Sequence, residues 1–288
     1  MQLFVDSDCD ISRKEAESYG ATFIPMPYYI GEQEVVPYED WEEFDGHAFY
    51  DSLRKGTLPT TAGLSAAKYI EIFEPAFKKG GEILYPHFSA AMTVTFNAMH
   101  QAIDELKAKY PGVRFEEIDL KAITIGAYVS LLEILQMAKD GKSIDEILAW
   151  AKEEIDHFAC YFFVDDLRFF AHSGRVSHFS GFMGNLIGIK PIIQINDEGK
   201  MDSIGKVTGR KNALKALVKY VEDLGDDIKN HPFVLGDTDA PELANIVERM
   251  LREKFGDDLK IVRCYCNPTA GSHSGPDGVG VAFHAKHR

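Results

Sequence analysis

The sequence has few cysteines, no long apolar run and no excess of positive charge. Its four cysteines, Cys9, Cys160, Cys264 and Cys266, are too few and too scattered over 288 residues for a disulfide framework, which predicts reduced and mostly packed thiols. No segment approaches the roughly 20 uninterrupted apolar residues of a membrane-spanning helix. These absences argue against a disulfide-stabilised secreted domain and against an integral helical membrane protein.

Basic residues are outnumbered, with 31 Lys and Arg against 45 Asp and Glu, and the formal net charge is −14. This charge repels phosphate backbones and anionic lipid surfaces, and no basic stripe is interleaved with aromatic residues. We therefore expect no nucleic-acid partner and no stable membrane insertion. The chain runs from Met1 directly into a predicted strand instead of a basic and apolar leader, so we expect a cytoplasmic protein.

Familiar catalytic signatures are also missing. No Walker loop, Gly-x-Ser-x-Gly elbow, His-Glu-x-x-His pair or Gly-x-Gly-x-x-Gly turn follows a predicted strand. The acidic turn Asp6-Ser7-Asp8-x-Asp10 lacks the glycine and the distal glutamate of a calcium loop. We therefore expect no metal site, and we interpret this turn as one that caps the following helix and satisfies backbone amides.

Strand and helix patterns alternate in the first part of the chain. An apolar share of 45% supplies a sizeable core, and the length suits two domains, which we place at residues 1–158 and 159–288. The alternation predicts a mainly parallel sheet in a three-layer α/β/α domain, with helices on both faces. Strands are expected at residues 3–5, 21–30, 83–88 and 113–118, and capping boxes mark helix starts at Ser12-x-x-Glu15 and Ser143-x-x-Glu146.

The second part of the chain follows a different pattern. Residues 190–195, the turn 196–199 and residues 201–207 are typical of a β-hairpin. Helices are expected at 210–224 and 241–255, and further strands at 233–235, 260–264 and 279–283. A hairpin beside strand–helix units predicts a mixed-sheet α/β domain. Before the last strand we expect a glycine-rich loop at 271–278, which contains His273.

Hydroxyl side chains gather in loops that follow the predicted strands. Thr60-Thr61 and Thr93-x-Thr95 lie beside predicted helix N-termini, where free amides favour an anion such as a carboxylate or a phosphate. Ser and Thr before helices are also common N-caps, and a loop histidine such as His273 can bond either to an anion or to backbone. These segments taken singly leave both interpretations open.

Several short segments spread along the chain match one family pattern in order and spacing. They are Val5-Asp6-Ser7, Pro59-Thr60-Thr61, Ser89 to Thr95, Val164-Asp165-Asp166-Leu167, Gly174-Arg175-Val176, Ile189-Lys190-Pro191-Ile192, Gly209-Arg210-Lys211-x-Ala213 and His273-Ser274-Gly275-Pro276. On these segments the whole chain resembles the DegV family of fatty-acid-binding proteins. Family patterns such as Val-Asp-Ser-Thr, Pro-Thr-Thr-Ser and His-Thr-Gly-Pro correspond to the first, second and last of them.

The resemblance implies a long-chain fatty acid in a tunnel between the two domains. It assigns the carboxyl group of the acid to Thr61, Thr93 and His273. The supporting loop residues are Ser7, Thr60, Ser89, Thr95, Ser274 and Gly275, and candidate partner contacts are Arg168, Arg175 and Arg210. The resemblance further implies a carrier without cofactor or catalysis of its own, which presents the acid to a separate ATP-dependent fatty acid kinase. We expect a monomer, because the carrier must dock with another protein.

The sequence departs from the family pattern at several positions. Ala62, Ala90 and Val94 replace a serine, a serine and a glycine, and Ala171-His172-Ser173 replaces Arg-Lys-Gly, which affects the partner more than the ligand class. A stand-alone enzyme acting on a small phosphorylated or keto substrate is the alternative, because the loops suit anions and His273 could form a covalent adduct. A purely structural interaction module would leave the Thr, Ser and His loops without a purpose.

Overall fold

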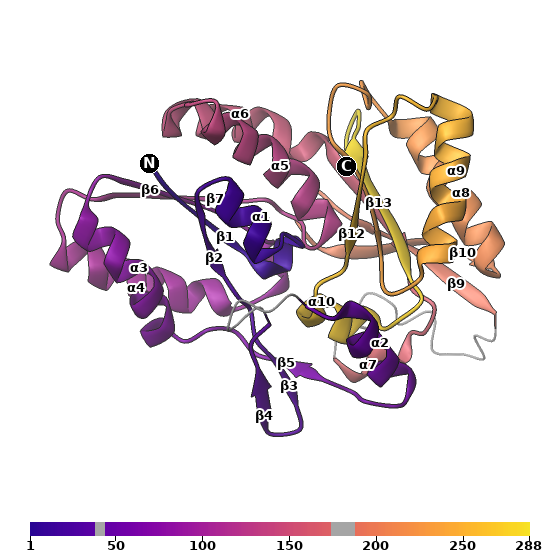
Figure 1. Cartoon of the computed structure of the whole chain (residues 1–288), viewed down its shortest axis with the longest axis horizontal. Helices are drawn as coiled ribbons and strands as arrows, with labels where there is room; N and C mark the ends of the chain where they lie inside the picture. The colour runs from indigo at the N-terminus through magenta and orange to yellow at the C-terminus, as the bar shows by residue number, and fades with distance from the viewer. Residues whose placement is uncertain (38–43, 174–187) are drawn as a thin grey trace.

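A computed structural model of the chain describes residues 1–37, 44–173 and 188–288. Within these residues the strands form three sheets (Figure 1). The first, sheet A, is parallel and has the order β2-β1-β6-β7. Its strands are β1 (Gln2–Asp6), β2 (Ala21–Ile24), β6 (Glu82–His87) and β7 (Arg114–Asp119).

Helices lie on both sides of sheet A. The pair α3 (Ala66–Lys79) and α4 (Thr95–Lys109) packs together on one side, and α5 (Ile125–Lys139) and α6 (Ile144–Glu154) lie on the other, with the short α1 (Arg13–Ser18) beside β2 (Figure 1). The reciprocal capping box of Ser143 and Glu146 begins α6, as the sequence predicts. At α1 the Ser12 side chain accepts from the backbone N–H of Glu15, whose own carboxylate accepts from the Tyr128 hydroxyl.

The second sheet, sheet C, is mixed and has the order β10-β9-β8-β13-β11-β12. Its strands are β8 (Phe158–Phe163), β9 (Ile189–Ile195), β10 (Met201–Thr208), β11 (Phe233–Asp237), β12 (Ile261–Tyr265) and β13 (Val279–His284). Helices α8 (Arg210–Leu224) and α9 (Pro241–Phe255) pack on one face, and α5 packs on the other. The expected fold class, with a parallel first sheet and a mixed second one, is confirmed.

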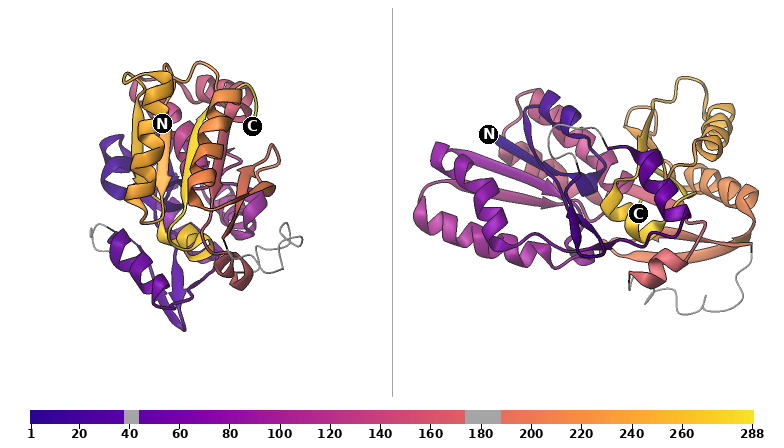
Figure 2. Two further views of the ribbon diagram at one scale, coloured as in Figure 1. Left: turned by 90° about the vertical axis from the view of Figure 1, so that its right-hand side faces the viewer. Right: turned by 60° about the horizontal axis from the view of Figure 1, so that its bottom comes forward.

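The third sheet and several short elements connect these two parts. Sheet B joins β4 (Gln33–Val35), β3 (Tyr28–Ile30) and β5 (Thr60–Thr61) in antiparallel order. The short elements are α2 (Gly46–Arg54), α7 (Arg168–His172), α10 (Pro268–Ser274) and the 3-10 turns η1 (Ser7–Cys9), η3 (Ala90–Met92) and η4 (Ile155–His157). Figure 2 shows α10 and α2 at the junction of the two larger parts.

Two expectations about secondary structure were wrong. The strand predicted over 21–30 is two strands in different sheets, because Pro25 and Pro27 lack the N–H groups that a continuous ladder needs. The predicted loop 271–278 begins as helix α10, with Asn267 as its N-cap and Pro268 at its first position. His273 therefore projects from the last helical turn, and Thr61 projects from a strand.

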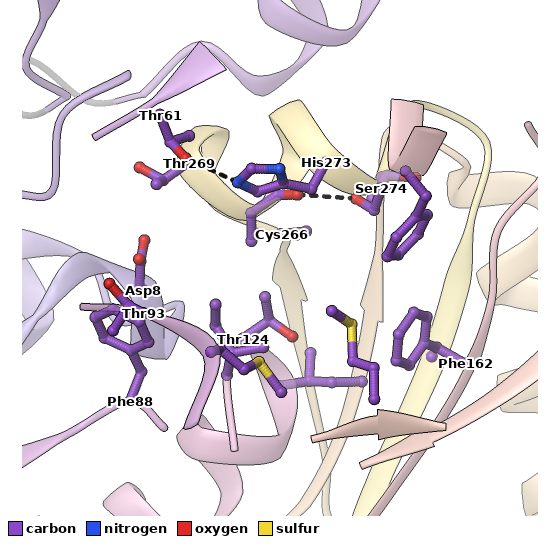
Figure 3. Close-up of a pocket in the computed structure, with 18 of the residues that line it drawn as sticks. Asp8, Thr61, Phe88, Thr93, Thr124, Phe162, Cys266, Thr269, His273 and Ser274 are labelled. Carbon is purple, nitrogen blue, oxygen red and sulfur yellow. Dashed lines mark hydrogen bonds between the residues drawn. The ribbon is translucent and has the colours of Figure 1, made fainter. Parts of the chain in front are cut away.

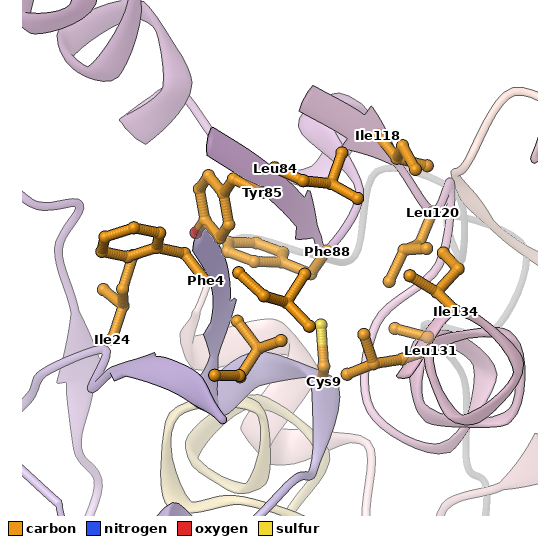
Figure 4. Packing of buried hydrophobic residues seen from close by; sticks show 14 of the residues in the cluster. Phe4, Cys9, Ile24, Leu84, Tyr85, Phe88, Ile118, Leu120, Leu131 and Ile134 are labelled. Carbon is orange, nitrogen blue, oxygen red and sulfur yellow. The ribbon is translucent and has the colours of Figure 1, made fainter. Parts of the chain in front are cut away.

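The core is continuous across the two larger sheets. Buried side chains of sheet A pack against Leu131 and Ile134 of α5 (Figure 4). The same cluster includes Val234 and Ala282 of sheet C, so α5 is apolar towards both sheets. This sharing explains why α5 is buried along most of its length. The division of the chain at residue 158 stays a prediction.

Candidate functional site

A cavity of about 740 Å³ lies between the loops that follow β1 and β6 and one face of sheet C. This volume falls within the roughly 300–1,000 Å³ that is usual for small-molecule sites. The wall is mostly apolar, with polar groups concentrated near α10 (Figure 3). Apolar lining residues include Met26, Phe88, Met92, Ile123, Ile125, Phe162, Phe163, Val164, Phe170, Met201 and Val279.

Two glycines shape the wall on sheet C. Gly236 of β11 and Gly280 of β13 are directly opposite each other in the antiparallel ladder. A Cβ atom at Gly236 would lie 2.3 Å from Cγ2 of Ile125, and one at Gly280 would lie 2.7 Å from its Cδ1. Ile125 is the first residue of α5, so the helix starts in close contact with the sheet. Side chains at these positions would push α5 away from the sheet.

Thr61 and His273 meet at the polar end of the cavity. Oγ1 of Thr61 and Nε2 of His273 are 2.9 Å apart (Figure 3). Pairing of β5 with β3 positions Thr61 opposite Tyr28. Helix α10 is held against the same region because the Thr269 hydroxyl donates to the Met26 carbonyl oxygen at 3.0 Å. The structure thus joins two side chains that are 212 residues apart in the sequence.

Thr93 and Thr95 have different environments although both line the cavity. Oγ1 of Thr93 accepts from the Thr95 N–H at 3.1 Å, which leaves its own proton available to a ligand. Thr95 is buried, and its Oγ1 accepts from the Leu64 N–H at 2.9 Å and shares a 3.1 Å hydrogen bond with the Tyr69 hydroxyl. Thr95 therefore fixes the loop after β5 against α4.

The remaining supporting residues differ in whether they line the cavity. Ser274 lines the cavity, whereas Ser7, Thr60, Ser89 and Gly275 are absent from its described lining. The Ser7 hydroxyl oxygen accepts from the Met26 N–H at 2.8 Å, and the Ser89 hydroxyl donates to the Gly199 carbonyl oxygen at 2.8 Å. Gly275 has φ +71° and packs against the Phe169 ring, where a Cβ atom would lie 2.2 Å from the ring. These residues shape the loops without contacting the cavity.

Two of the three candidate partner contacts are described by the structure, and neither belongs to the described cavity lining. Arg168 is exposed and forms an ion pair with Asp166 at 2.6 Å. Arg210 forms ion pairs with Asp165 at 2.8 Å and Asp277 at 3.5 Å. Arg175 lies outside the described residues. The two described arginines are thus already paired with carboxylates.

The acidic turn after β1 is buried, and two of its carboxylates satisfy other groups. Asp6 accepts from the Asp8 and Phe88 N–H groups and from the Tyr85 hydroxyl, and Asp10 accepts from the backbone and side-chain N–H groups of Asn267 at 2.8 Å each. Both aspartates thus satisfy backbone amides as expected, but Asp6 caps the 3-10 turn η1, and the following helix α1 is capped by Ser12. Burial raises the pKa of Asp6 to about 6 and that of Asp10 to about 7.

Asp8 and Thr124 are among the lining residues that the sequence did not predict. Asp8 was assigned to capping but lines the cavity with a side chain that is 3% exposed. Thr124 also lines it and has φ +55°, a strained value for a β-branched residue, while its N–H donates to the Asp8 carbonyl oxygen at 2.7 Å. The spacing of aspartates pointed to Asp8, whereas no sequence signal pointed to Thr124.

The thiols and the possible metal ligands show no further site. Burial raises the pKa of the Cys266 thiol, which lines the cavity, well above its usual value, so it is a poor nucleophile. All four cysteines are free, as expected. Among the described residues, no group of three or more His, Cys, Asp or Glu side chains could hold a metal ion.

No helix in the described part of the chain is long and apolar enough to span a bilayer.

The fold itself is shared with solved proteins. A lipid-binding DegV protein from Thermotoga maritima superposes with a TM-score of 0.83 at 21% identity, covering 100% of this chain and 99% of the other. A stearic acid-binding protein from Eubacterium ventriosum gives a TM-score of 0.83 at 19% identity, with 99% of each chain covered.

The sequence comparisons agree with the fold. A DegV domain-containing protein of Clostridium perfringens is 32% identical over 282 residues, which cover 98% of this chain and 96% of the relative. The family model described as "Uncharacterised protein, DegV family" matches residues 1–286. The chain therefore belongs to the DegV family.

Proposed function

We propose that this protein binds a long-chain fatty acid in the cavity, with the carboxyl group at Thr61, Thr93 and His273. The observation that carries the proposal is the 2.9 Å contact between Thr61 Oγ1 and His273 Nε2 at the polar end of a mostly apolar cavity of about 740 Å³. One end supplies hydrogen-bond donors for a carboxylate, and the rest suits an alkyl chain. The two superposed structures support it, because one is a lipid-binding protein and the other a stearic acid-binding protein.

Burial of the alkyl chain supplies most of the affinity in this proposal. Each buried methylene contributes about 0.8 kcal/mol, so a chain of a dozen or more contributes roughly 10 kcal/mol before the costs of association. Hydrogen bonds to a charged head group add about 1.5–3 kcal/mol. The polar residues accordingly fix the orientation of the acid, and the shape of the apolar wall selects the chain.

We further propose that the protein is a cytoplasmic, monomeric carrier whose two domains, 1–158 and 159–288, enclose the acid in a tunnel. The carrier presents the carboxylate to a separate ATP-dependent fatty acid kinase, which would supply both nucleotide and magnesium. Thr61, Thr93 and His273 then hold the carboxylate in position as a nucleophile. The proposed partner contacts are Arg168, Arg175 and Arg210. Of the two arginines that the structure describes, Arg168 is the more exposed.

Lipid analysis of the purified protein tests ligand and site together. Native mass spectrometry, followed by denaturing extraction, should identify a co-purifying C14 to C18 acid. The triple variant Thr61→Ala, Thr93→Ala, His273→Ala should carry less of it. Thr60→Ala is the matched control, because Thr60 is exposed on the same strand and absent from the described lining.

Protein that is free of lipid and takes up no added fatty acid would reject the carrier proposal. Consumption of a small phosphorylated or keto substrate by the purified protein alone would instead favour the stand-alone enzyme. ATP consumption that requires both a kinase subunit and the loaded protein would support presentation of the carboxyl group.

A further inference from the structure

Asp8 differs from the other two aspartates of its turn. Both carboxylate oxygens of Asp6 and Oδ1 of Asp10 accept hydrogen bonds. Oδ2 of Asp10 and Oδ1 of Asp8 are buried without a hydrogen-bond partner in the described part of the chain, and of these two residues only Asp8 lines the cavity. The Asp8 side chain is 3% exposed and lines the cavity. In Figure 3 its carboxyl group points to the space between Thr93 and the Thr61–His273 pair.

The surroundings of Asp8 disfavour a negative charge. The Thr269 hydroxyl, which faces it from α10, donates its proton to the Met26 carbonyl oxygen. A buried carboxylate with few donors is costly, whereas a neutral carboxyl can itself donate one hydrogen bond. The titratable groups around it or across the cavity are Asp6, Cys9, Asp10, Tyr69, Tyr85, Lys200, Asp237, Cys266 and His273.

We propose that Asp8 is a further head-group residue, which donates the O–H of its neutral carboxyl to one carboxylate oxygen of the bound acid. The two carboxyl groups then share one proton, while Thr61, Thr93 and His273 serve the remaining lone pairs of the ligand. This inference rests on the proposed function, because it requires a carboxylate ligand in this cavity. It adds a residue whose protonation sets the pH range in which the ligand binds.

The charge balance around Asp8 supports this role. Burial raises the pKa of Asp8 well above its usual value, and the charges of Asp6 and Asp10 raise it further, with partial opposition from Thr269. A bound carboxylate raises the pKa again because two like charges disfavour a second ionisation. Above the pKa of the free protein, each acid bound should therefore take up one proton, and affinity should fall about tenfold per pH unit.

The test is the pH dependence of binding. The probe is dodecanoic acid below its aggregation concentration, displacing a fluorescent fatty acid between pH 6 and pH 9. The wild-type affinity should fall with rising pH, and calorimetry in buffers of different ionisation heat should show proton uptake. Asp8→Asn keeps the shape, stays neutral and offers an N–H donor, so its affinity should change little over the same range.

Asp10→Asn is the matched control. Asp10 lies in the same turn, has a pKa that burial raises to about 7, and is absent from the described cavity lining. It should retain the wild-type pH slope. Should it not fold, the apo protein gives a second readout: Asp8→Asn should raise the urea midpoint more at high pH than at low pH, because a rise in pH favours the costly ionised form of the buried Asp8.

The outcomes separate this inference from the proposed function. Wild-type protein that binds no fatty acid at any pH rejects the function. Binding with the same slope in wild type and Asp8→Asn rejects the role of Asp8 alone. Loss of wild-type binding in EDTA would mean that a divalent cation bridges an ionised Asp8 to the ligand. Preference for dodecanol, reversed in Asp8→Asn, would mean that Asp8 selects a neutral head group; either result overturns the inference.

Discussion

The two ends of the cavity are stabilised by different interactions. At the polar end, long-range hydrogen bonds join β5, η1 and the loop after β2 to α10, through Thr61, Asp10 and Met26. At the apolar end, the opposed Gly236 and Gly280 allow Ile125 of α5 to pack directly on sheet C. The polar end therefore depends on a few directional contacts, and the apolar end depends on shape.

This difference separates orientation from affinity. Hydrogen bonds to a head group discriminate sharply between chemical classes but contribute little net free energy, whereas apolar burial is non-directional and grows with each methylene. The structure assigns these two tasks to different segments of the chain. Changes to ligand, pH or side chains should therefore affect the two ends in distinguishable ways.

Shortening the ligand should have the largest effect. Replacing hexadecanoic by octanoic acid removes eight methylenes, which at about 0.8 kcal/mol each should cost roughly 6 kcal/mol, or about 10⁴-fold in affinity. Fluorescent displacement with a series of even-numbered acids measures this directly. A loss of less than about tenfold over the series would show that the head group, and not the chain, supplies the affinity.

The buried acidic turn should make stability depend on pH. The pKa values of Asp6 and Asp10 are raised to about 6 and about 7, so the folded state binds these protons more tightly than the unfolded state. Stability is full below the unfolded pKa near 4 and is lost as the pH rises through 6 and 7; between pH 5 and pH 8 the loss is roughly 4 kcal/mol. Urea unfolding of the apo protein at pH 5 and pH 8 should show the decrease, and equal stabilities would contradict the burial argument.

A methyl group at the sheet should disturb the apolar end. Gly236→Ala places a Cβ atom 2.3 Å from Ile125 Cγ2, so we expect a loss of about 1–3 kcal/mol in unfolding free energy. Gly205→Ala is the control, because no atom lies within 4 Å of its added Cβ. Adding Ile125→Val to Gly236→Ala should restore part of the loss, and a failure to do so would place the strain elsewhere.

Removing one hydroxyl at the polar end should have the smallest effect. Thr61→Val keeps the side-chain shape and should lower fatty-acid affinity by about 1 kcal/mol, or roughly fivefold. The neighbouring Thr60→Val should leave the affinity unchanged, because Thr60 is exposed. The same displacement assay measures both. Equal losses in the two variants would point to damage of strand β5 and not to a head-group contact.

Local sequence rules predicted most elements but misjudged two that depend on distant partners. The capping box of Ser143 and Glu146 and the hairpin turn after Ile195 are local signals, and both are found as expected. Pro25 and Pro27 interrupt a run that otherwise fits one strand, and only the separate partners of β2 and β3 show that the halves belong to different sheets. The glycines of residues 271–275 favoured a loop over helix α10. Gly271 is needed in this helix because a Cβ atom there would lie 2.5 Å from the Tyr50 hydroxyl oxygen.

The sequence by itself determined the alternation of strands and helices, the apolar faces, and the hydroxyl and histidine types available for a carboxylate, because these properties belong to neighbouring residues. Tertiary structure decided which of them share a cavity. It placed Thr61 beside His273, turned Thr95 into a loop anchor, and left Asp8 facing the cavity while Asp6 and Asp10 found partners. The physical reason is that burial and hydrogen-bond satisfaction are set by residues far apart in the chain, which no local pattern encodes.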